Sequence, residues 1–448
     1  MRESHRASNA FLIGASKARL ARGLASAASI EHMNNIPQAA RQATRTPYAK
    51  LVLTLGAGLA LLPIVLTGCA TAASTPLGGT TSASSSTTSD AVSSTSASTT
   101  AETITDTAAA AEAFLATLSD EERDAVLYDY DDETKTTSWS NFPVTFVERA
   151  GLNLSDLDEE QKAAALEVLK TLLNDEAYET VSGIMGGDEY LHENSSSTES
   201  SLGQYYIALF GDPSDTTAWE LQFGGHHLGI NASLDGTAGT ITFAPTHLGV
   251  QPAVYTDASG EEVQPFDAIY TDAFAFFDSL TEDQQATVTS GDVTMCAPGD
   301  TCDFAAGSGL TGADLTDEQK ELLLDLVANW SGMADEETAA AARAEILATI
   351  DETVIAWSGE TTYDMTTGNG INFSISGPDV YVAFQAQQGS AGADVTGVTT
   401  SGWGHVHTIY RDPSNDYAGS VAQQAATGGM GGAQPGGGTP PAGGPSQG

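Results

Sequence analysis

The chain has 448 residues, of which 59 are acidic and 16 basic, which gives a formal charge of −43. Half of the basic residues precede Cys69, so the rest of the chain has eight basic against 57 acidic residues, a formal charge of −49. Such a surface repels nucleic acid and anionic headgroups, because few cations are available to displace phosphate counterions. We therefore expect no nucleic-acid partner.

An export signal is the first feature along the chain. Residues 51–66 form an uncharged apolar run after a basic segment, which is typical of a secretory signal and shorter than the about 20 residues of a membrane span. The run ends in Leu66-Thr67-Gly68-Cys69, which resembles the bacterial lipobox, where the Cys thiol receives diacylglycerol. We predict a signal region over residues 1–68, with Met33 the better start of translation. The mature protein is expected to be anchored by lipid on Cys69 at the outer face of the cytoplasmic membrane.

Two low-complexity segments flank the part that can fold. Residues 69–103 are mostly Ser, Thr and Ala, and residues 420–448 are rich in Gly and Pro. Neither buries enough apolar surface to offset its conformational entropy, so we expect a flexible tether and a disordered tail. Between them we predict one compact body made of two half-repeats, 104–265 and 266–419.

The repeat prediction rests on three landmarks in the same order. Residues 151–162 match residues 309–320 at seven of twelve positions, at an offset of 158 residues. Segments beginning FLATLSD (114–120) and FFDSLTE (276–282) precede the two copies, and a β-rich stretch follows each. Such self-similarity indicates an internal duplication, against the alternative of chance similarity between helix starts.

Local signals give each half the same predicted layout. Ser119 followed by Glu122 indicates a capping box, and apolar stripes predict helices that open near Asp158 and contain Leu322–Trp330. β-branched and aromatic residues predict strands at 205–210, 219–223, 239–243, 371–375 and 380–385. Helices followed by strands, twice over, predict an α+β fold of two pseudo-symmetric repeats with mostly antiparallel sheets.

Cys296 and Cys302 remain as a pair if Cys69 carries lipid. The loop between them contains Pro298 and Gly299, so a tight turn could bring the thiols together. We predict a disulfide in preference to a metal site, because no other soft ligand is near in sequence.

Six histidines lie in the predicted body, and four of them form two clusters at similar points of the two halves: His226, His227, His405 and His407. Residues two apart on a strand point to the same face, so His405 and His407 should project together. If the halves pack about a pseudo-twofold axis, the clusters meet. Three nitrogen ligands with an open position would suit zinc or copper(II), and histidines that act structurally or as acid/base groups without metal are the alternative.

The surroundings of these histidines suggest further roles. Asp412 or Asp416 could accept from an imidazole N–H and fix its tautomer, although Asp412 could equally pair with Arg411 or cap a turn. We expect His247 in a surface loop, although it could also line the same cleft as the clusters, and His192 facing solvent. The sequence contains no dinucleotide fingerprint and no phosphate-binding Gly-Lys-Ser/Thr loop, so no nucleotide cofactor is expected.

A set of ordered motifs resembles a known family. They include Leu209-Phe210-Gly211-Asp212-Pro213, Gly224-Gly225-His226-His227-Leu228-Gly229-Ile230-Asn231 and the stretch from His405 to Tyr417. Together they resemble the family catalogued as domain of unknown function 3500, over about residues 110–418. The family usually has Glu where this chain has Gly224, and Gly where it has Ala418; neither departure removes a histidine. The resemblance implies an exported bacterial protein with a His-bearing site and no established activity.

Three functional hypotheses stay open. The first is a lipid-anchored protein that binds copper or zinc through His405, His407 and one or both of His226 and His227. The second is an extracytoplasmic enzyme, in which the histidines bind a catalytic metal or act as acid/base groups; its catalytic candidates are His227, His407, Arg411 and Asp412, with Arg411 orienting an anionic substrate. The third is a non-catalytic module that binds a small ligand or a partner between its halves.

Overall fold

The computed structural model describes residues 98–195, 202–288, 293–298, 304, 308–388 and 395–422. The chain divides into two units, Met1–Ser89 and Asp90–Gly448, and every described residue belongs to the second. The predicted signal region, Cys69, Cys302 and most of the predicted tether and tail lie outside the described residues. The lipid anchor and the Cys296–Cys302 disulfide therefore stay predictions.

Eight helices and fourteen strands form the described part of the chain. The helices are α1 (Thr100–Thr117), α2 (Asp120–Val126), α3 (Glu159–Leu172), α4 (Asp175–Asn194), α5 (Asp267–Ser279), α6 (Glu282–Thr287), α7 (Asp317–Ser331) and α8 (Glu336–Thr349). The strands are β1 (Leu127–Tyr128), β2 (Leu152–Asn153), β3 (Tyr206–Phe210), β4 (Ala218–Gly224), β5 (Leu228–Asp235), β6 (Thr240–Thr242), β7 (Thr246–Val250), β8 (Tyr255–Thr256), β9 (Glu262–Val263), β10 (Leu310–Thr311), β11 (Val354–Gly359), β12 (Ile371–Ser376), β13 (Tyr381–Gln387) and β14 (Gly402–Arg411).

Several helices begin at capping boxes. The predicted box of Ser119 and Glu122 is confirmed at the start of α2, and Asp158 caps α3 in the same way. A further box, formed by Thr99 and Glu102, starts α1 at Thr100. The folded body therefore begins earlier than the predicted boundary at residue 104, because a threonine that looks like part of the tether satisfies the first backbone N–H groups of a helix.

The strands form one twelve-stranded sheet and a separate β8–β9 hairpin. The order in the large sheet is β1-β3-β4-β5-β7-β14-β13-β12-β11-β10, with β2 paired to β3 and β6 paired to β5. Among these pairings β1–β3 is parallel and the others are antiparallel. The predicted α+β class with a mostly antiparallel sheet in one body is therefore confirmed.

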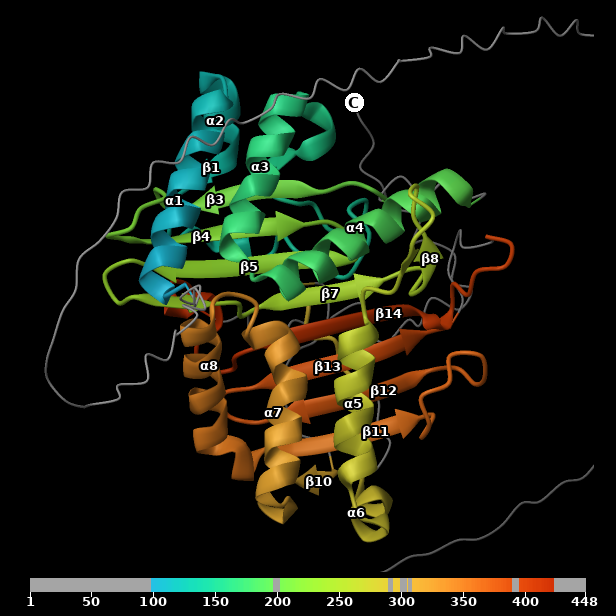
Figure 1. The fold of residues 1–448 in the computed structure, drawn as a ribbon. Helices are drawn as coiled ribbons and strands as arrows, with labels where there is room; N and C mark the ends of the chain where they lie inside the picture. Colours follow the sequence, from blue (N-terminus) through green and yellow to red (C-terminus); the bar gives the residue numbers. More distant parts are fainter. Residues whose placement is uncertain are drawn as a thin grey trace, which may run out of the picture. The chain divides into compact units, whose positions relative to one another are not determined.

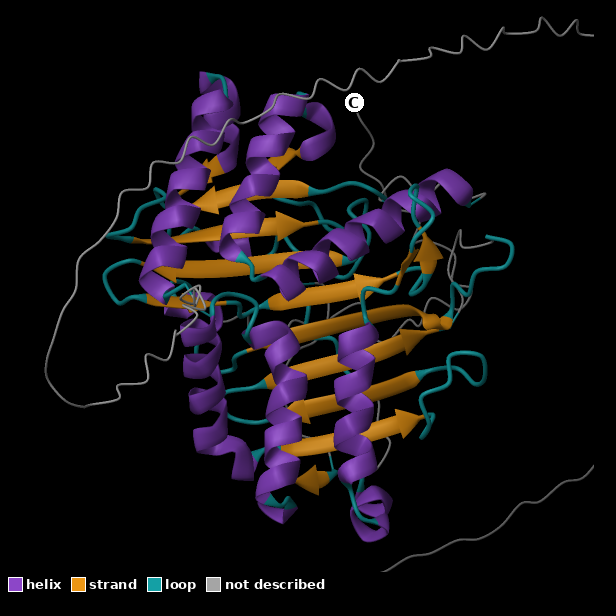
Figure 2. Cartoon of the chain, in the orientation of Figure 1, coloured by secondary structure: helices purple, strands orange, loops and turns teal. Residues whose placement is uncertain are grey.

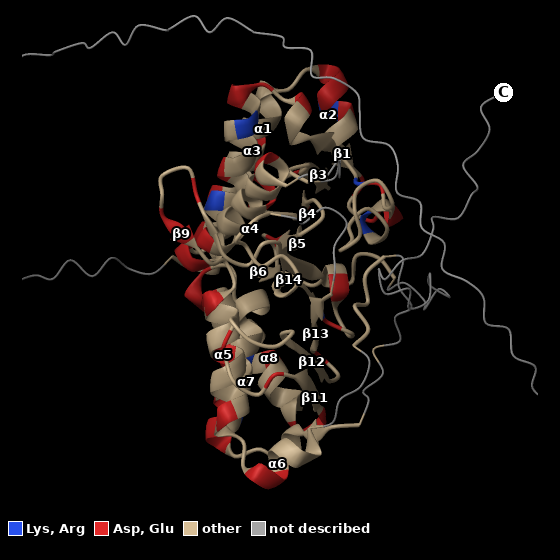
Figure 3. Ribbon diagram, turned by 90° about the vertical axis from the view of Figure 1, so that its right-hand side faces the viewer, with Lys and Arg blue, Asp and Glu red and all other residues tan. Residues whose placement is uncertain are grey.

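Helices α1, α3, α4, α5, α7 and α8 cover one face of this sheet (Figures 1 and 2). Figure 3 shows the two layers from the side, with acidic residues spread over the helices and far more numerous than basic ones. Many of the acidic residues that give the chain its negative charge therefore lie on the helix layer. None of the described helices has the length and apolar character needed to cross a membrane.

The two faces of β14 have different neighbours. Thr408 faces the helices, since its hydroxyl accepts a hydrogen bond from the Trp330 indole of α7 (2.8 Å). Side chains alternate along a strand, so His405, His407 and Ile409 point to the opposite face. On that face Ile409 packs in a cluster with Trp139 and Cys296, which belong to irregular segments. The histidines therefore lie beneath loops and not beneath the helix layer.

Strands β7 and β14 join the first-half strands to the second-half strands. They pair antiparallel, with His407 opposite Gly249, and β7 pairs on its other side with β5. This order places the start of β5, next to His226 and His227, only one strand away from His407. The sheet topology therefore brings together two histidine clusters separated by about 180 residues of sequence.

Candidate functional site

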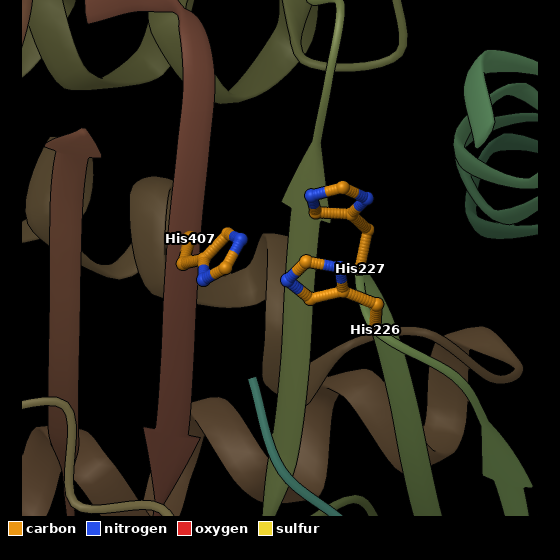
Figure 4. A group of neighbouring side chains, drawn as sticks. All are labelled: His226, His227 and His407. Atoms are coloured by element: carbon orange, nitrogen blue, oxygen red, sulfur yellow. The ribbon is translucent and has the colours of Figure 1, made fainter. Parts of the chain in front are cut away.

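Three histidines meet at the centre of the sheet. His226 and His227 lie in the connection between β4 and β5, and His407 lies on β14. Each offers one ring nitrogen, and these three atoms lie within 4.8 Å of one another. Figure 4 shows the rings of His226 and His227 one above the other, both pointing toward His407. The predicted convergence of the two clusters is thus seen in the geometry, and this group could hold a metal ion.

His405 adjoins the group without belonging to it. Its Nε2 lies 3.3 Å from His407 Nε2, and its ring centre lies 5.6 Å from that of His227. The sequence prediction that His405 and His407 project from the same face of a strand is confirmed by this contact.

Glycines make room for the rings. A Cβ on Gly224 would lie 2.1 Å from the Leu228 carbonyl oxygen, and one on Gly225 would lie 2.3 Å from that of Gln204, so the tight turn before His226 requires both. Gly249 of β7 lies under the site, where a Cβ would stand 3.0 Å from the His407 ring and 3.3 Å from the His227 ring. The absence of a side chain at this position lets the two rings approach each other.

Asp188 of α4 forms the shortest hydrogen bond to the histidine group. One carboxylate oxygen lies 2.5 Å from His227 Nδ1, and the other accepts from the Tyr205 hydroxyl at 2.6 Å. Because a carboxylate accepts, His227 carries a proton on Nδ1, which leaves Nε2 as the nitrogen that can bind a metal. Asp188 is not among the site residues predicted from the sequence.

Gly186 of α4 lies tightly against Tyr255. A Cβ on Gly186 would lie 2.4 Å from the Tyr255 hydroxyl oxygen, whereas one on Gly187 would meet its neighbours at 3.4 Å or more, an ordinary contact. A side chain at Gly186 would therefore displace Tyr255 or move α4 away from it. A Gly-Gly-Asp sequence within an amphipathic helix is therefore the one signal that could have drawn attention to Asp188.

Amide groups surround the other side of the site. The side-chain nitrogens of Asn141 and Gln387 each lie 3.4 Å from His407 Nδ1, whereas Asn141 Oδ1 is buried with no hydrogen-bond partner among the described residues. Rotating the Asn141 amide by half a turn would let Oδ1 accept from His407 Nδ1–H, a choice of orientation that rests on the hydrogen-bond network alone. His407 would then also present an unprotonated Nε2.

His247 has a supporting position. It lies on β7, fully buried, and its Nε2–H donates to the His226 carbonyl oxygen (2.9 Å) while its ring stacks on Trp139 at 6.2 Å. The prediction of a surface loop for this residue is therefore wrong, because the pairing of β7 with β5 and β14 buries it. His192 is exposed near the end of α4, as predicted.

Arg149 holds the segment that carries Trp139 and Asn141 against the site. Its guanidinium is buried and donates to the carbonyl oxygens of Ser140, Phe142 and Gly225, each at 2.7 Å. Burial lowers the pKa of Arg149 to about 10. The segment that carries Trp139 and Asn141 is thus held against the residue that precedes His226.

The environment disfavours the charged form of His226, His405 and His407. Side chains of His227, His405 and His407 are 0–5% exposed, and His226 is partly exposed. Burial, and then the neighbouring His227, lowers the pKa of His405 to about 3; burial, and then other histidines of the group, lowers the pKa of His226 and His407 well below 6.5. Neutral imidazole is the form that binds a metal.

Orphaned nitrogens mark the same place. His226 Nδ1 and His227 Nε2 are buried and have no hydrogen-bond partner among the described residues. Buried polar atoms without partners are rare in folded proteins and call for an explanation such as a bound ion or water. Two such atoms in stacked rings fit a site that binds a cation.

The residues predicted to assist the histidines are engaged elsewhere. Arg411 is buried in an ion pair with Asp416 (2.6 Å), donates to the Cys296 carbonyl oxygen and lies 5.6 Å from the centre of the Trp139 ring. Asp412 accepts from the backbone N–H groups of Ser414 and Asn415, the turn-capping alternative raised from the sequence. At His227 the tautomer-fixing role predicted for Asp412 or Asp416 falls to Asp188, and Arg411 stabilises the turn after β14.

A cavity of about 250 Å³ lies near the beginning of β14. Its lining includes Tyr190 of α4, Tyr255 of β8, Met365 and Gly404, the residue that precedes His405. Its size would accommodate a small molecule.

The buried His247 leads to a prediction for the metal-free protein. Burial lowers its pKa to about 3, whereas an unfolded histidine titrates near 6.5. As pH falls below 6.5 the unfolded chain takes up a proton that the folded chain refuses, so the free energy of unfolding decreases until pH reaches the folded pKa. From pH 7 to pH 5 this group should remove about 2 kcal/mol.

Urea unfolding of metal-free wild type and His247→Gln at both pH values measures this effect. The stability of wild type should fall by about 2 kcal/mol more than that of the variant. Equal pH dependence in the two proteins would show that His247 does not stay neutral in the folded state.

One comparison with known proteins gives a match. The family described as "Protein of unknown function (DUF3500)" matches residues 100–419. No curated protein and no solved structure matches the chain.

Proposed function

Because the chain belongs to the DUF3500 family of proteins of unknown function, its role has to be argued from the site, and we propose that it binds copper or zinc. The proposed ligands are His227 and His407, with His226 and His405 completing the set. Membership of the family confirms the resemblance noted in the sequence and supplies no activity.

The distance between His405 Nε2 and His407 Nε2 is the observation that carries the proposal. Two ligand nitrogens at about 2.0–2.1 Å from a tetrahedral zinc ion lie roughly 3.3–3.4 Å apart. The observed separation is 3.3 Å. Two neutral imidazoles have no other strong reason to bring these atoms so close in a buried place, since at best one weak N–H···N hydrogen bond joins them.

The chemistry of the donors supports the same metals. Imidazole nitrogen suits zinc and copper, whereas calcium and magnesium prefer oxygen ligands. His226, His227 and His407 supply nitrogen only, and His227 and His407 are buried away from water. A bound ion would supply Lewis acidity, or one-electron chemistry in the case of copper.

We also propose that the body arose by duplication, as the sequence repeat suggests. Support comes from the order of elements: two helices, a short strand (β2, which follows β1, in the first half and β10 in the second), two more helices and then antiparallel strands occur in both halves. β2 and β10 each pair with the first long strand of their half, and β7 meets β14 where the halves join.

The location proposed for this protein is the outer face of the cytoplasmic membrane. The lipobox-like sequence that ends in Cys69 and the Ser/Thr-rich stretch after it support a lipid anchor and a tether. An extracytoplasmic metal site would then be exposed to the metals of that compartment.

A second candidate function is catalysis at the same metal. His226 is partly exposed, and a cavity of about 250 Å³ lies beside the residue that precedes His405. A small substrate in such a cavity would be near the site. A coordination position open to water would favour this candidate, and a closed four-histidine site would favour storage or transfer of the metal.

Elemental analysis tests the proposal. The full-length protein is incubated with Zn²⁺ or Cu²⁺, freed of unbound ions by gel filtration and analysed. We expect about one metal ion per chain, held through a second gel filtration, as for a built nitrogen site. Metal that washes off, or remains at far below one equivalent, would rule out the proposed function.

Gly249→Ala tests the site without replacing any histidine. The added Cβ would press on the His407 and His227 rings at 3.0 and 3.3 Å and force them apart. Misplacing two ligands should weaken metal binding by about 10-fold or more. Competition with a chelator measures the affinity, and Gly332→Ala at the C-terminal end of α7, whose Cβ would lie 3.0 Å from the Ala328 carbonyl oxygen and 3.3 Å from the Ala339 Cβ, is the control for added bulk. Unchanged affinity in Gly249→Ala would place the metal elsewhere.

A further inference from the structure

We propose that Asp188 is a positioning residue of the metal site, which holds His227 in its ligating orientation and offsets the charge of the bound ion. This inference rests on the proposed metal-binding function and assigns a role to a residue outside the histidine clusters. Tyr205 is its supporting partner.

The hydrogen bonds of Asp188 account for the orientation. The side chain is 1% exposed, and its two oxygens contact His227 Nδ1 (2.5 Å) and the Tyr205 hydroxyl (2.6 Å). The first contact fixes both the tautomer and the rotation of the imidazole, which aims Nε2 at the group. His227 Nε2 is buried without a hydrogen-bond partner among the described residues, so Asp188 presents a nitrogen that nothing else in the described chain uses.

Charge gives Asp188 its second task. The guanidinium of Arg149 is buried next to the site, where it donates to the Gly225 carbonyl oxygen at 2.7 Å. Neutral imidazoles would leave a divalent ion and this guanidinium uncompensated in a poorly hydrated place, where Coulomb interactions are strong. Asp188 supplies a negative charge in direct contact with a ligand ring. A carboxylate bonded to the far nitrogen of a ligating histidine also raises the basicity of that ligand.

The structural alternative is that Asp188 only satisfies the buried Tyr205 hydroxyl and the His227 N–H. The variant Asp188→Asn distinguishes the purely structural role from the proposed positioning role. Its amide can accept from His227 and donate to Tyr205, so it keeps the shape and both hydrogen bonds but loses the charge. A purely structural role would therefore survive this change, whereas the proposed role would not.

Metal affinity and a ligand-field spectrum provide the readouts. Zn²⁺ binding to the full-length protein is measured by chelator competition, and Co²⁺ serves as a visible-absorption probe of the same site. Asp188→Asn should weaken Zn²⁺ binding by about 10- to 100-fold and shift the Co²⁺ bands. Tyr205→Phe, which keeps the charge and removes one hydrogen bond, should weaken binding by roughly three- to tenfold.

Asp335 offers a matched control. It is a buried aspartate (7% exposed) on the N-terminal cap of α8, where it accepts from Thr100 and Thr338. Asp335→Asn removes a buried charge of the same type at a different place, so it should lower stability while leaving the Zn²⁺ affinity and the Co²⁺ spectrum unchanged.

The outcomes distinguish this inference from the proposed function. If wild type binds no metal, the proposed function fails. If wild type binds one ion and Asp188→Asn binds within about twofold as tightly, with an unchanged spectrum, metal binding stands and the role of Asp188 is overturned. Should Asp188→Asn not fold, Tyr205→Phe decides: wild-type affinity and spectrum in that variant would overturn the positioning role.

Discussion

Replacing His407 with alanine should abolish stoichiometric metal binding. His407 belongs to the group of three nitrogens within 4.8 Å and also lies 3.3 Å from His405, so every proposed coordination set includes it. Loss of a direct ligand should weaken binding by more than the about 100-fold that loss of an outer hydrogen-bonding partner costs. Chelator competition with Zn²⁺ on the full-length variant measures the change.

Alanine variants of the other histidines rank the contribution of each side chain to metal binding. His405→Ala should weaken binding less than His407→Ala, because His405 contacts only one edge of the group. His192→Ala, on the exposed part of α4, should bind metal like wild type. Near-ultraviolet circular dichroism confirms that each variant is folded. If His407→Ala still binds one metal ion per chain, the metal is bound elsewhere and the proposed site is wrong.

The contact between His405 and His407 could be foreseen, because alternation along a strand places both on one face, whatever the surrounding fold. The approach of His226 and His227 comes from the order of the strands, since only β7 separates the connection that carries His227 from β14. The two clusters do not occupy equivalent places in their halves: β7 and β14 are the strands that meet where the halves join, whereas His226 and His227 precede β5.

The partners of the histidines could not be foreseen, because they come from distant and irregular parts of the chain. Asp188 lies in a helix whose mixed polar and apolar sequence, apart from the glycines before Asp188, does not indicate which polar side chain is buried. Asn141 lies in a segment without regular structure that folds over the sheet. Contacts of this kind depend on tertiary packing, which periodicity does not encode.

His247 shows how the environment overrides a local signal. Pro245 and Pro252 flank the segment that contains His247, and this favours the prediction of a loop. The intervening residues are Thr246 to Val250, and they form β7 because strands on both sides complete its hydrogen bonds. A five-residue central strand is stabilised by its neighbours and not by its own propensity.

The same principle applies to the polar residues that β4 and β5 turn away from the helices. Glu220 and Ser233 lie opposite each other on these strands, and Ser233 donates to Glu220 at 3.1 Å. Lys135, in the short 3₁₀ helix Glu133–Thr136, forms an ion pair with Glu220 at 2.9 Å, and both side chains are 0% exposed. A sequence of alternating apolar and polar residues predicts a solvated outer face, but here the covering segment buries that face and must supply a partner for the acid.

Lys135→Met is therefore expected to cause a large loss of stability. The apolar stem keeps its contacts, while Glu220 loses its counter-ion and remains buried; breaking a buried pair in this way costs about 3–5 kcal/mol. Urea unfolding at pH 7 measures the loss. The exposed pair of Lys170 and Glu167, with a separation of 3.7 Å, is the control, since Lys170→Met should change stability by less than about 1 kcal/mol.

The pH dependence of the Lys135→Met variant tests the physical cause. Burial raises the pKa of Glu220 even in the presence of Lys135, and removing the cation should raise it further. A carboxyl whose folded pKa exceeds its unfolded value loses stability as pH rises, so lowering the pH from 7 to 5 should protonate Glu220 and restore part of the loss. Glu220→Gln in the Lys135→Met background should give a similar gain at pH 7, because a neutral amide needs no counter-ion. A loss that is the same at both pH values and is not relieved by Glu220→Gln would mean that Lys135 acts through packing against Tyr130 and Phe210, whose rings lie 4.5 and 5.1 Å from its ammonium group, and not through its charge.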